Sequence, residues 1–69
     1  MGALGRISAF DAAVGIGLVR LDDGRELDFH ATAITDGTRS VAVGTAVSVE
    51  VTPTHRGRFE ASEVTPLLD

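Results

Sequence analysis

The sequence contains no cysteine, tryptophan, tyrosine or lysine, and it has only two prolines. Without cysteine, neither a disulfide nor a thiolate metal site can stabilise the fold, an absence compatible with a reducing compartment. The only aromatic residues are three phenylalanines, at Phe10, Phe29 and Phe59. A chain of 69 residues with this composition is expected to form one small domain around an aliphatic core.

Positively charged residues are also scarce. All six basic residues are arginine, and the formal net charge is −4. The average field of such a chain repels phosphate backbones instead of steering them towards it. No apolar run approaches the length needed to cross a bilayer, and the amino terminus lacks the charged and apolar regions of a signal peptide. We therefore expect a soluble cytoplasmic domain that has no membrane partner.

The run Val14–Val19 is apolar at every residue that has a side chain. Successive side chains of a strand point to opposite faces, which places Ile16 and Leu18 on one face and Val19 on the other. An antiparallel strand in a soluble protein normally has one wet face. Large apolar groups on both faces therefore indicate that one face has a role beyond the core.

Turn signals divide the chain into five short segments with strand patterning, and no segment of useful length has a helical period. Asp23-Gly24 predicts a hairpin, because this pair accepts the positive φ angles of a tight reversal. Residues 31–34 are expected to form a single helical turn, 35–44 a long loop and 54–57 a turn. The predicted strands cover approximately residues 3–10, 14–21, 26–30, 46–52 and 58–65.

The last two strands differ in their regularity. Val47, Val49 and Val51 alternate cleanly and are predicted to point inward. In the last strand, the apolar spacing slips by one between Ala61 and Val64, which indicates a bulge. Five short strands in a chain of this length predict a small closed barrel, since closure removes exposed sheet edges.

Three stretches, in the same order, resemble the cold-shock domain: Gly5–Asp11, Gly15–Val19 and Leu27–Ile34. The resemblance covers the chain from Leu4 to about Leu67 with little gapping. It implies one all-β domain over residues 1–69, a five-stranded antiparallel OB-fold barrel, in agreement with the residue patterns. It also implies an inherited role in binding single-stranded RNA or DNA, in transcription or as an RNA chaperone.

The resemblance fails where the family binds its ligand. Cold-shock domains bind single strands through aromatic side chains on the second and third strands. Their first motif usually reads Lys-Gly-Phe-Gly-Phe-Ile and is Val14–Val19 here, and their second usually reads Val-Phe-Val-His-Phe and is Leu27–Ala31 here. The tryptophan expected on the first strand is Ala9, and the aromatic residue expected in the long loop is replaced by Thr38.

Only Phe10 and His30 remain of that aromatic platform, and the carboxylate of Asp28 takes a place in its middle. Phe29 falls where the family has an inward valine. Stacking on an aromatic side chain contributes roughly 1–3 kcal/mol per base, so losing several platforms removes on the order of 5 kcal/mol. A micromolar complex has about 8 kcal/mol in all. We expect binding of the family type to weaken to millimolar or to vanish.

Two functions follow, with lost function as a third interpretation. The first is weak binding of single-stranded nucleic acid through the remaining platform residues and the arginines. The second is contact with a protein partner, or a homodimer, through an apolar patch centred on Ile16 and Leu18. The candidate surface for either function comprises Ser8, Ala9, Phe10, Ile16, Leu18, Arg20, Asp28, His30, Ala31, Thr38, Arg56 and Arg58.

Other chemistry finds little support in the sequence. Gly15-x-Gly17 lacks the third glycine and the helix of a dinucleotide-binding turn, and it is interpreted as barrel curvature. Asp28 and His30 share one strand face, but two ligands without a third make a poor metal site. No serine has a spacing to a histidine that indicates a catalytic triad. We therefore expect no enzyme, no cofactor and no metal.

Overall fold

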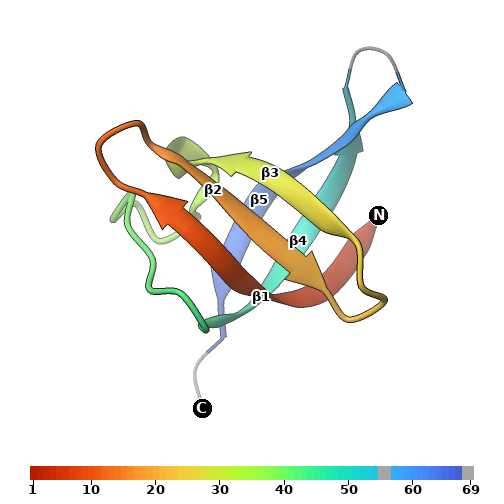
Figure 1. The fold of residues 1–69 in the computed structure, drawn as a ribbon, viewed down its shortest axis with the longest axis horizontal. Helices are drawn as coiled ribbons and strands as arrows, with labels where there is room; N and C mark the ends of the chain where they lie inside the picture. Colours follow the sequence, from red (N-terminus) through yellow and green to blue (C-terminus); the bar gives the residue numbers. More distant parts are fainter. Residues whose placement is uncertain (55–56, 68–69) are drawn as a thin grey trace.

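The computed structural model describes residues 1–54 and 57–67. Within these residues, five strands close into a barrel in the order β1-β2-β3-β5-β4 (Figure 1). The elements are β1 (Gly2–Asp11), β2 (Ile16–Leu21), β3 (Glu26–His30), the short 3₁₀ turn η1 (Ala31–Ala33), β4 (Ala46–Pro53) and β5 (Phe59–Pro66). The predicted all-β class and the five-stranded barrel are confirmed. The pairings are antiparallel as predicted, except that β3 and β5 run parallel.

The observed strands lie within two residues of the predicted ones, and the largest difference is at the start of β2. This strand begins at Ile16 and not at Val14. The Asp11 carboxylate accepts the backbone N–H groups of Ala13 at 3.1 Å and Val14 at 3.2 Å, which holds these residues in a turn. Gly15 closes the turn with a φ of +78°. The turn predicted over 54–57 includes His55 and Arg56, which lie outside the described residues.

Buried residues alternate with more exposed ones along β2, β3 and β4, as the period of two requires. Val19, Val47 and Val64 have no exposed surface, and Phe29 is 1% exposed. The full set of buried apolar residues is Ile7, Val19, Leu21, Leu27, Phe29, Ile34, Val47, Val49, Val51, Ala61 and Val64. Every inward position predicted in β4 belongs to this set.

Each of two bulges changes which residues share a face. In the β4–β5 pairing, Glu50 lies opposite Glu63 and Val51 opposite Ala61, so Ser62 is the extra residue. This confirms the bulge predicted between Ala61 and Val64. In the β1–β2 pairing, the register shifts between Ile7 and Ala9, and Ser8 is the extra residue. The side-chain pattern of residues 3–10 gives no sign of this second bulge.

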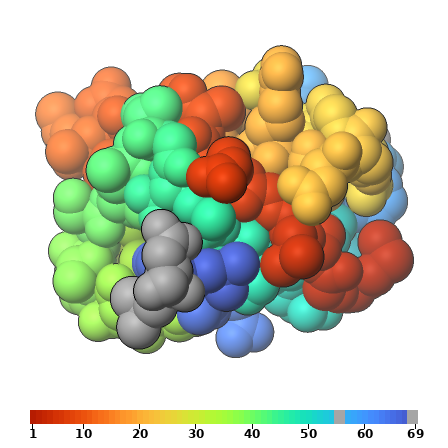
Figure 2. Space-filling model, turned by 90° about the horizontal axis from the view of Figure 1, so that it is seen from below, coloured from red at the N-terminus to blue at the C-terminus, as the bar shows by residue number. Residues whose placement is uncertain are grey.

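The long loop returns along the end of the barrel to β1. The backbone N–H of Gly44 donates to Ile7 O at 2.8 Å, and the Ile7 N–H donates to Thr45 O at 3.0 Å. The Arg6 guanidinium adds a third bond, to Gly44 O at 3.0 Å. Figure 2 shows the end of this loop beside the first strand on the outer surface. The loop is therefore held against the same strand that contributes to the candidate surface.

Candidate nucleic-acid interface

The outer face of β1, β2 and β3 carries most of the predicted surface residues. Ile16 is 41% exposed, and Leu18 is half-buried on the same face. Across the β2–β3 ladder, Ile16 lies opposite His30 and Leu18 lies opposite Asp28. Paired residues of a ladder share a face, so all four side chains project outward. The predicted orientation of the two aliphatic side chains is confirmed.

The bulge at Ser8 decides which residues of β1 join this face. Ala9 lies opposite Leu18 and turns outward, whereas Phe10 lies opposite Gly17 on the inner side of the sheet. The Phe10 ring is half-buried and stacks on Phe29, with ring centroids 6.1 Å apart and planes at 11°. The structure thus brings Ala9 to Leu18 and directs the Phe10 ring towards the core.

Charges of both signs surround the aliphatic centre. The Ser8 hydroxyl donates to a Glu26 carboxylate oxygen at 3.1 Å, and the Arg20 Nε lies 3.9 Å from that oxygen. Asp28 pairs with Leu18 on one side and with Glu60 of β5 on the other. The carboxylates of Asp28 and Glu26 therefore disfavour phosphate in this part of the face.

One end of the face forms a cationic groove of about 380 Å³. Its polar side chains are His30, Thr32 and Arg39, and its apolar wall is the β1–β2 turn together with Ala31. Among the described residues that line it there is no carboxylate. A guanidinium and an imidazole beside an apolar wall can hold a phosphate while a base or sugar lies on the wall.

Arg39, and not the predicted Thr38, lines this groove. The Thr38 N–H and hydroxyl both donate to Asp36, at 3.0 and 2.8 Å, and so bind it into its own loop. Arg39 has a φ of +56°, the one positive φ outside glycine in residues 1–54 and 57–67. The sequence analysis missed Arg39, and the signal that could have found it is a cation directly after the Asp36-Gly37 turn.

The opposite end of the face forms a groove of about 410 Å³ between β3 and β5. Phe59, which the sequence analysis did not assign to the surface, is 49% exposed in its wall. Figure 1 shows the end of β4 and the start of β5 extending beyond the rest of the barrel. Predicted surface residue Arg58 also lines this groove, whereas predicted Arg56 lies outside the described residues.

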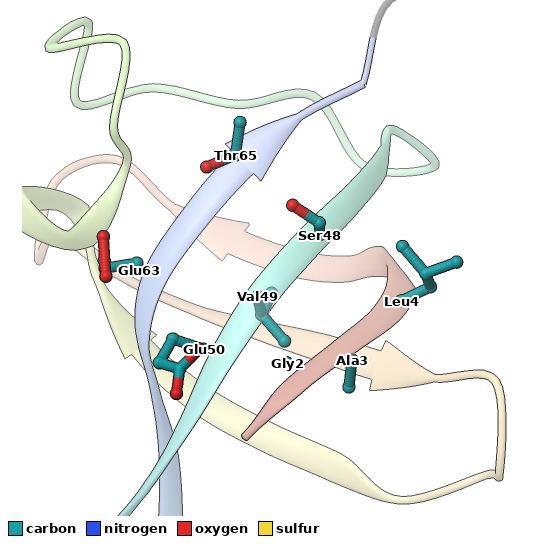
Figure 3. Close-up of a pocket in the computed structure, with 8 residues that line it drawn as sticks. All are labelled: Gly2, Ala3, Leu4, Ser48, Val49, Glu50, Glu63 and Thr65. Atoms are coloured by element: carbon teal, nitrogen blue, oxygen red, sulfur yellow. The ribbon is translucent and has the colours of Figure 1, made fainter.

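A third hollow, of about 400 Å³, lies on β1, β4 and β5 (Figure 3). Two carboxylates, Glu50 and Glu63, line it together with Leu4, Ser48 and Thr65. The amino-terminal nitrogen of Met1 lies 2.6 Å from Glu50. No arginine or histidine of the described residues lines this hollow, so it offers no side-chain cation to a phosphate.

In residues 1–54 and 57–67 no group of three or more histidine, cysteine, aspartate or glutamate side chains is arranged to hold a metal ion. The described part of the chain contains no helix with the length and apolarity that a membrane crossing needs.

Comparison with known proteins agrees with the fold. The solved structure "drosophila Unr CSD456", a cold-shock-domain structure, superposes on 99% of this chain with a TM-score of 0.80 and 23% sequence identity. The match covers 27% of that longer chain. No protein-family model and no curated protein sequence matches. The chain therefore has a cold-shock-like OB fold.

Proposed function

We propose that this domain binds single-stranded nucleic acid weakly, along the outer face of β1, β2 and β3. The cold-shock-like barrel supports the class of ligand. The observation that carries the proposal is the groove of His30 and Arg39, which adjoins the aliphatic residues of β2 and is lined by no carboxylate among the described residues. Phosphate contacts at this end and apolar contacts at Ile16 and Leu18 take the place of aromatic stacking.

The expected affinity is low. Aliphatic side chains offer contact area but no π face, and stacking contributes roughly 1–3 kcal/mol per base where it is present. The carboxylate of Asp28 adds no donor for a phosphate. We expect a dissociation constant of about 0.1–1 mM at low salt, which corresponds to roughly 4–5.5 kcal/mol of binding free energy. We assign no catalytic activity.

The proposal is tested by titrating the isotope-labelled domain with oligothymidine at an ionic strength of about 10 mM and following backbone amide shifts. Saturable shifts are expected at Ile16, Leu18, His30 and Arg39. The substitution Arg39→Ala should weaken binding about twofold to fivefold, the range of one exposed charge contact. Arg6→Ala is the matched control, because it removes the same charge from a side chain that donates to Gly44 O at 3.0 Å and lines neither groove of this face.

Added salt should weaken binding with a shallow slope, about −0.7 per phosphate contact for a single strand. The proposal is rejected if no saturable shift occurs up to about 1 mM oligonucleotide, where even a millimolar complex is half formed. Shifts confined to the hollow on β1, β4 and β5 would reject it equally.

A second candidate function is contact with another protein copy through the aliphatic residues of β2 and the preceding turn. Val14 is 66% exposed and Ile16 is 41% exposed, and they lie within three residues of each other. Neighbouring exposed apolar side chains favour association more than scattered ones do.

A further inference from the structure

The groove between β3 and β5 exists because these two strands barely pair. Their ladder is the single parallel bridge between Asp28 and Glu60. Beside that bridge, the start of β3 and the start of β5 enclose the groove of about 410 Å³, which is lined by Arg25, Glu26, Leu27, Asp28, Arg58 and Phe59. Its volume is in the range of small-molecule sites.

Phe59 gives this groove an open aromatic face. Among the three phenylalanines, Phe29 is 1% exposed and Phe10 is half-buried against it, whereas Phe59 is 49% exposed. A single exposed apolar residue is common on a protein surface. Phe59 differs because it forms the wall of a groove whose other wall is polar, an arrangement that suits a flat ligand with a polar edge.

Two carboxylates of the described residues, Glu26 and Asp28, form the polar wall. Glu26 receives the Ser8 hydroxyl and lies near Arg20. Asp28 has no side-chain hydrogen bond or ion pair with any other described residue. An ionised carboxylate accepts hydrogen bonds but donates none. Asp28 therefore disfavours phosphate and favours a group that presents N–H donors.

Guanine presents the edge that fits this acceptor best. Its N1–H and N2–H donors are adjacent and parallel, so both oxygens of a carboxylate can accept from one base, as in a bidentate guanidinium pair. Thymine and uracil present one N–H between two carbonyl oxygens, which a carboxylate repels. Cytosine and adenine present an amino group beside a ring nitrogen acceptor and can satisfy only one carboxylate oxygen.

The two arginines of the groove differ in their availability. The guanidinium of Arg25 lies 2.8 Å from the Asp23 carboxylate. Arg58 makes no ion pair with the other described residues and stands directly before Phe59 in the chain. A base stacked on Phe59 would bring its own phosphate to Arg58.

We propose that the groove between β3 and β5 is a guanine-selective base site, with Phe59 stacking on the base, Asp28 accepting from its N1–H and N2–H, and Arg58 contacting the adjoining phosphate. The inference rests on the proposed binding of single strands and adds a sequence preference to it. The carboxylate that weakens phosphate binding in the middle of the face thereby acquires a role in selecting the base.

The test compares two DNA hexamers, one of thymidines alone and one with a single guanosine at the fourth position, by amide shifts of the full chain. The guanosine hexamer should bind about fivefold more tightly, the lower end of discrimination by a bidentate pair. Asp28→Asn should abolish this preference without weakening the thymidine hexamer, since it also removes a negative charge. Phe59→Ala should weaken the guanosine hexamer about fivefold.

Leu4→Ala is the matched control, because Leu4 is 54% exposed and lines the hollow away from β2 and β3. Saturable binding of both hexamers with equal affinity overturns the guanine site and leaves the proposed function standing. A guanosine preference that survives both Asp28→Asn and Phe59→Ala also overturns it. No binding of either hexamer overturns the proposed function itself. Concentration-dependent shifts of the groove amides without DNA would indicate a protein contact there and reject the base site.

Discussion

At the scale of single residues, Gly17 and Phe29 depend on each other. Gly17 lies opposite both Phe10 and Phe29 in the two ladders of β2. A Cβ atom built on Gly17 would lie 2.6 Å from Phe29 Cε1 and 2.9 Å from Ala9 O. The absence of a side chain at Gly17 therefore leaves the space that the Phe29 ring occupies. Gly17 lies between the outward residues Ile16 and Leu18 in β2.

We predict that Gly17→Ala lowers the free energy of unfolding by about 1–3 kcal/mol, because the added methyl overpacks the core against Phe29. Urea denaturation monitored by circular dichroism measures the change. Gly2→Ala is the control, since the nearest atom to its added Cβ is Val49 O at 3.9 Å. Equal losses of stability in the two variants would contradict the packing argument.

At the scale of elements, aspartates organise the connections between strands. Asp11, Asp23 and Asp36 each accept the backbone N–H of the residue two positions later, at 3.1, 2.9 and 3.0 Å. These are Asx turns, in which a carboxylate substitutes for a backbone carbonyl. Part of the chain's acidity is thus explained by its turns, and the Asp36 turn also sets the start of the segment that presents Arg39.

Acid should remove the stability that the carboxylates of these turns contribute. The Thr38 N–H, followed by the Thr38 hydroxyl, holds the pKa of Asp36 below its ordinary value of 3.8. The Arg25 N–H, followed by the Arg25 guanidinium, likewise lowers the pKa of Asp23. Because the unfolded chain then binds protons first, the stability that these carboxylates contribute is present above pH 3.8 and is lost as the pH falls through the folded-state values.

We therefore predict that the Asp36→Asn variant loses less free energy of unfolding than the wild type as the pH falls below 3.8. Asparagine still accepts the Thr38 N–H but does not titrate in this range. Urea midpoints measured between neutral pH and about pH 3 test this. Asp22→Asn provides the comparison, since the Asp22 side chain accepts no hydrogen bond from the other described residues. A steeper acid loss in Asp36→Asn than in the wild type would contradict the assignment.

At the scale of the whole molecule, the apolar strip is small relative to what a stable dimer needs. A standard interface takes about 800 Å² from each partner, which would be roughly a sixth of the 4508 Å² surface of this domain. The exposed residues Val14 and Ile16, with the half-buried Leu18, cover only part of that area, and the charged residues of β3 interrupt the patch.

We predict a monomer by sedimentation velocity up to a concentration of about 0.1 mM, with no change on Ile16→Ser. A dimer at that concentration that Ile16→Ser dissociates would favour protein contact over nucleic-acid binding. Running the same samples with oligothymidine distinguishes the two functions, because a buried Ile16 in a dimer would be protected from the strand.

The sequence by itself determined the barrel, its turns and the outward direction of Ile16 and Leu18. These follow from local rules: alternation along a strand has a period of two, and an aspartate-glycine pair accepts the backbone angles of a tight turn. The predicted bulge in β5 has the same origin, because Ala61 and Val64 can both face the core only if one residue is extra.

Tertiary structure alone decided how the ends of the candidate surface are built. The bulge at Ser8 turns the Phe10 ring onto Phe29, and β5 runs past the core so that Phe59 stays open. The long loop brings Arg39 to His30. Each outcome depends on where strands end relative to one another and on a register between distant segments, and the local pattern of side chains contains neither.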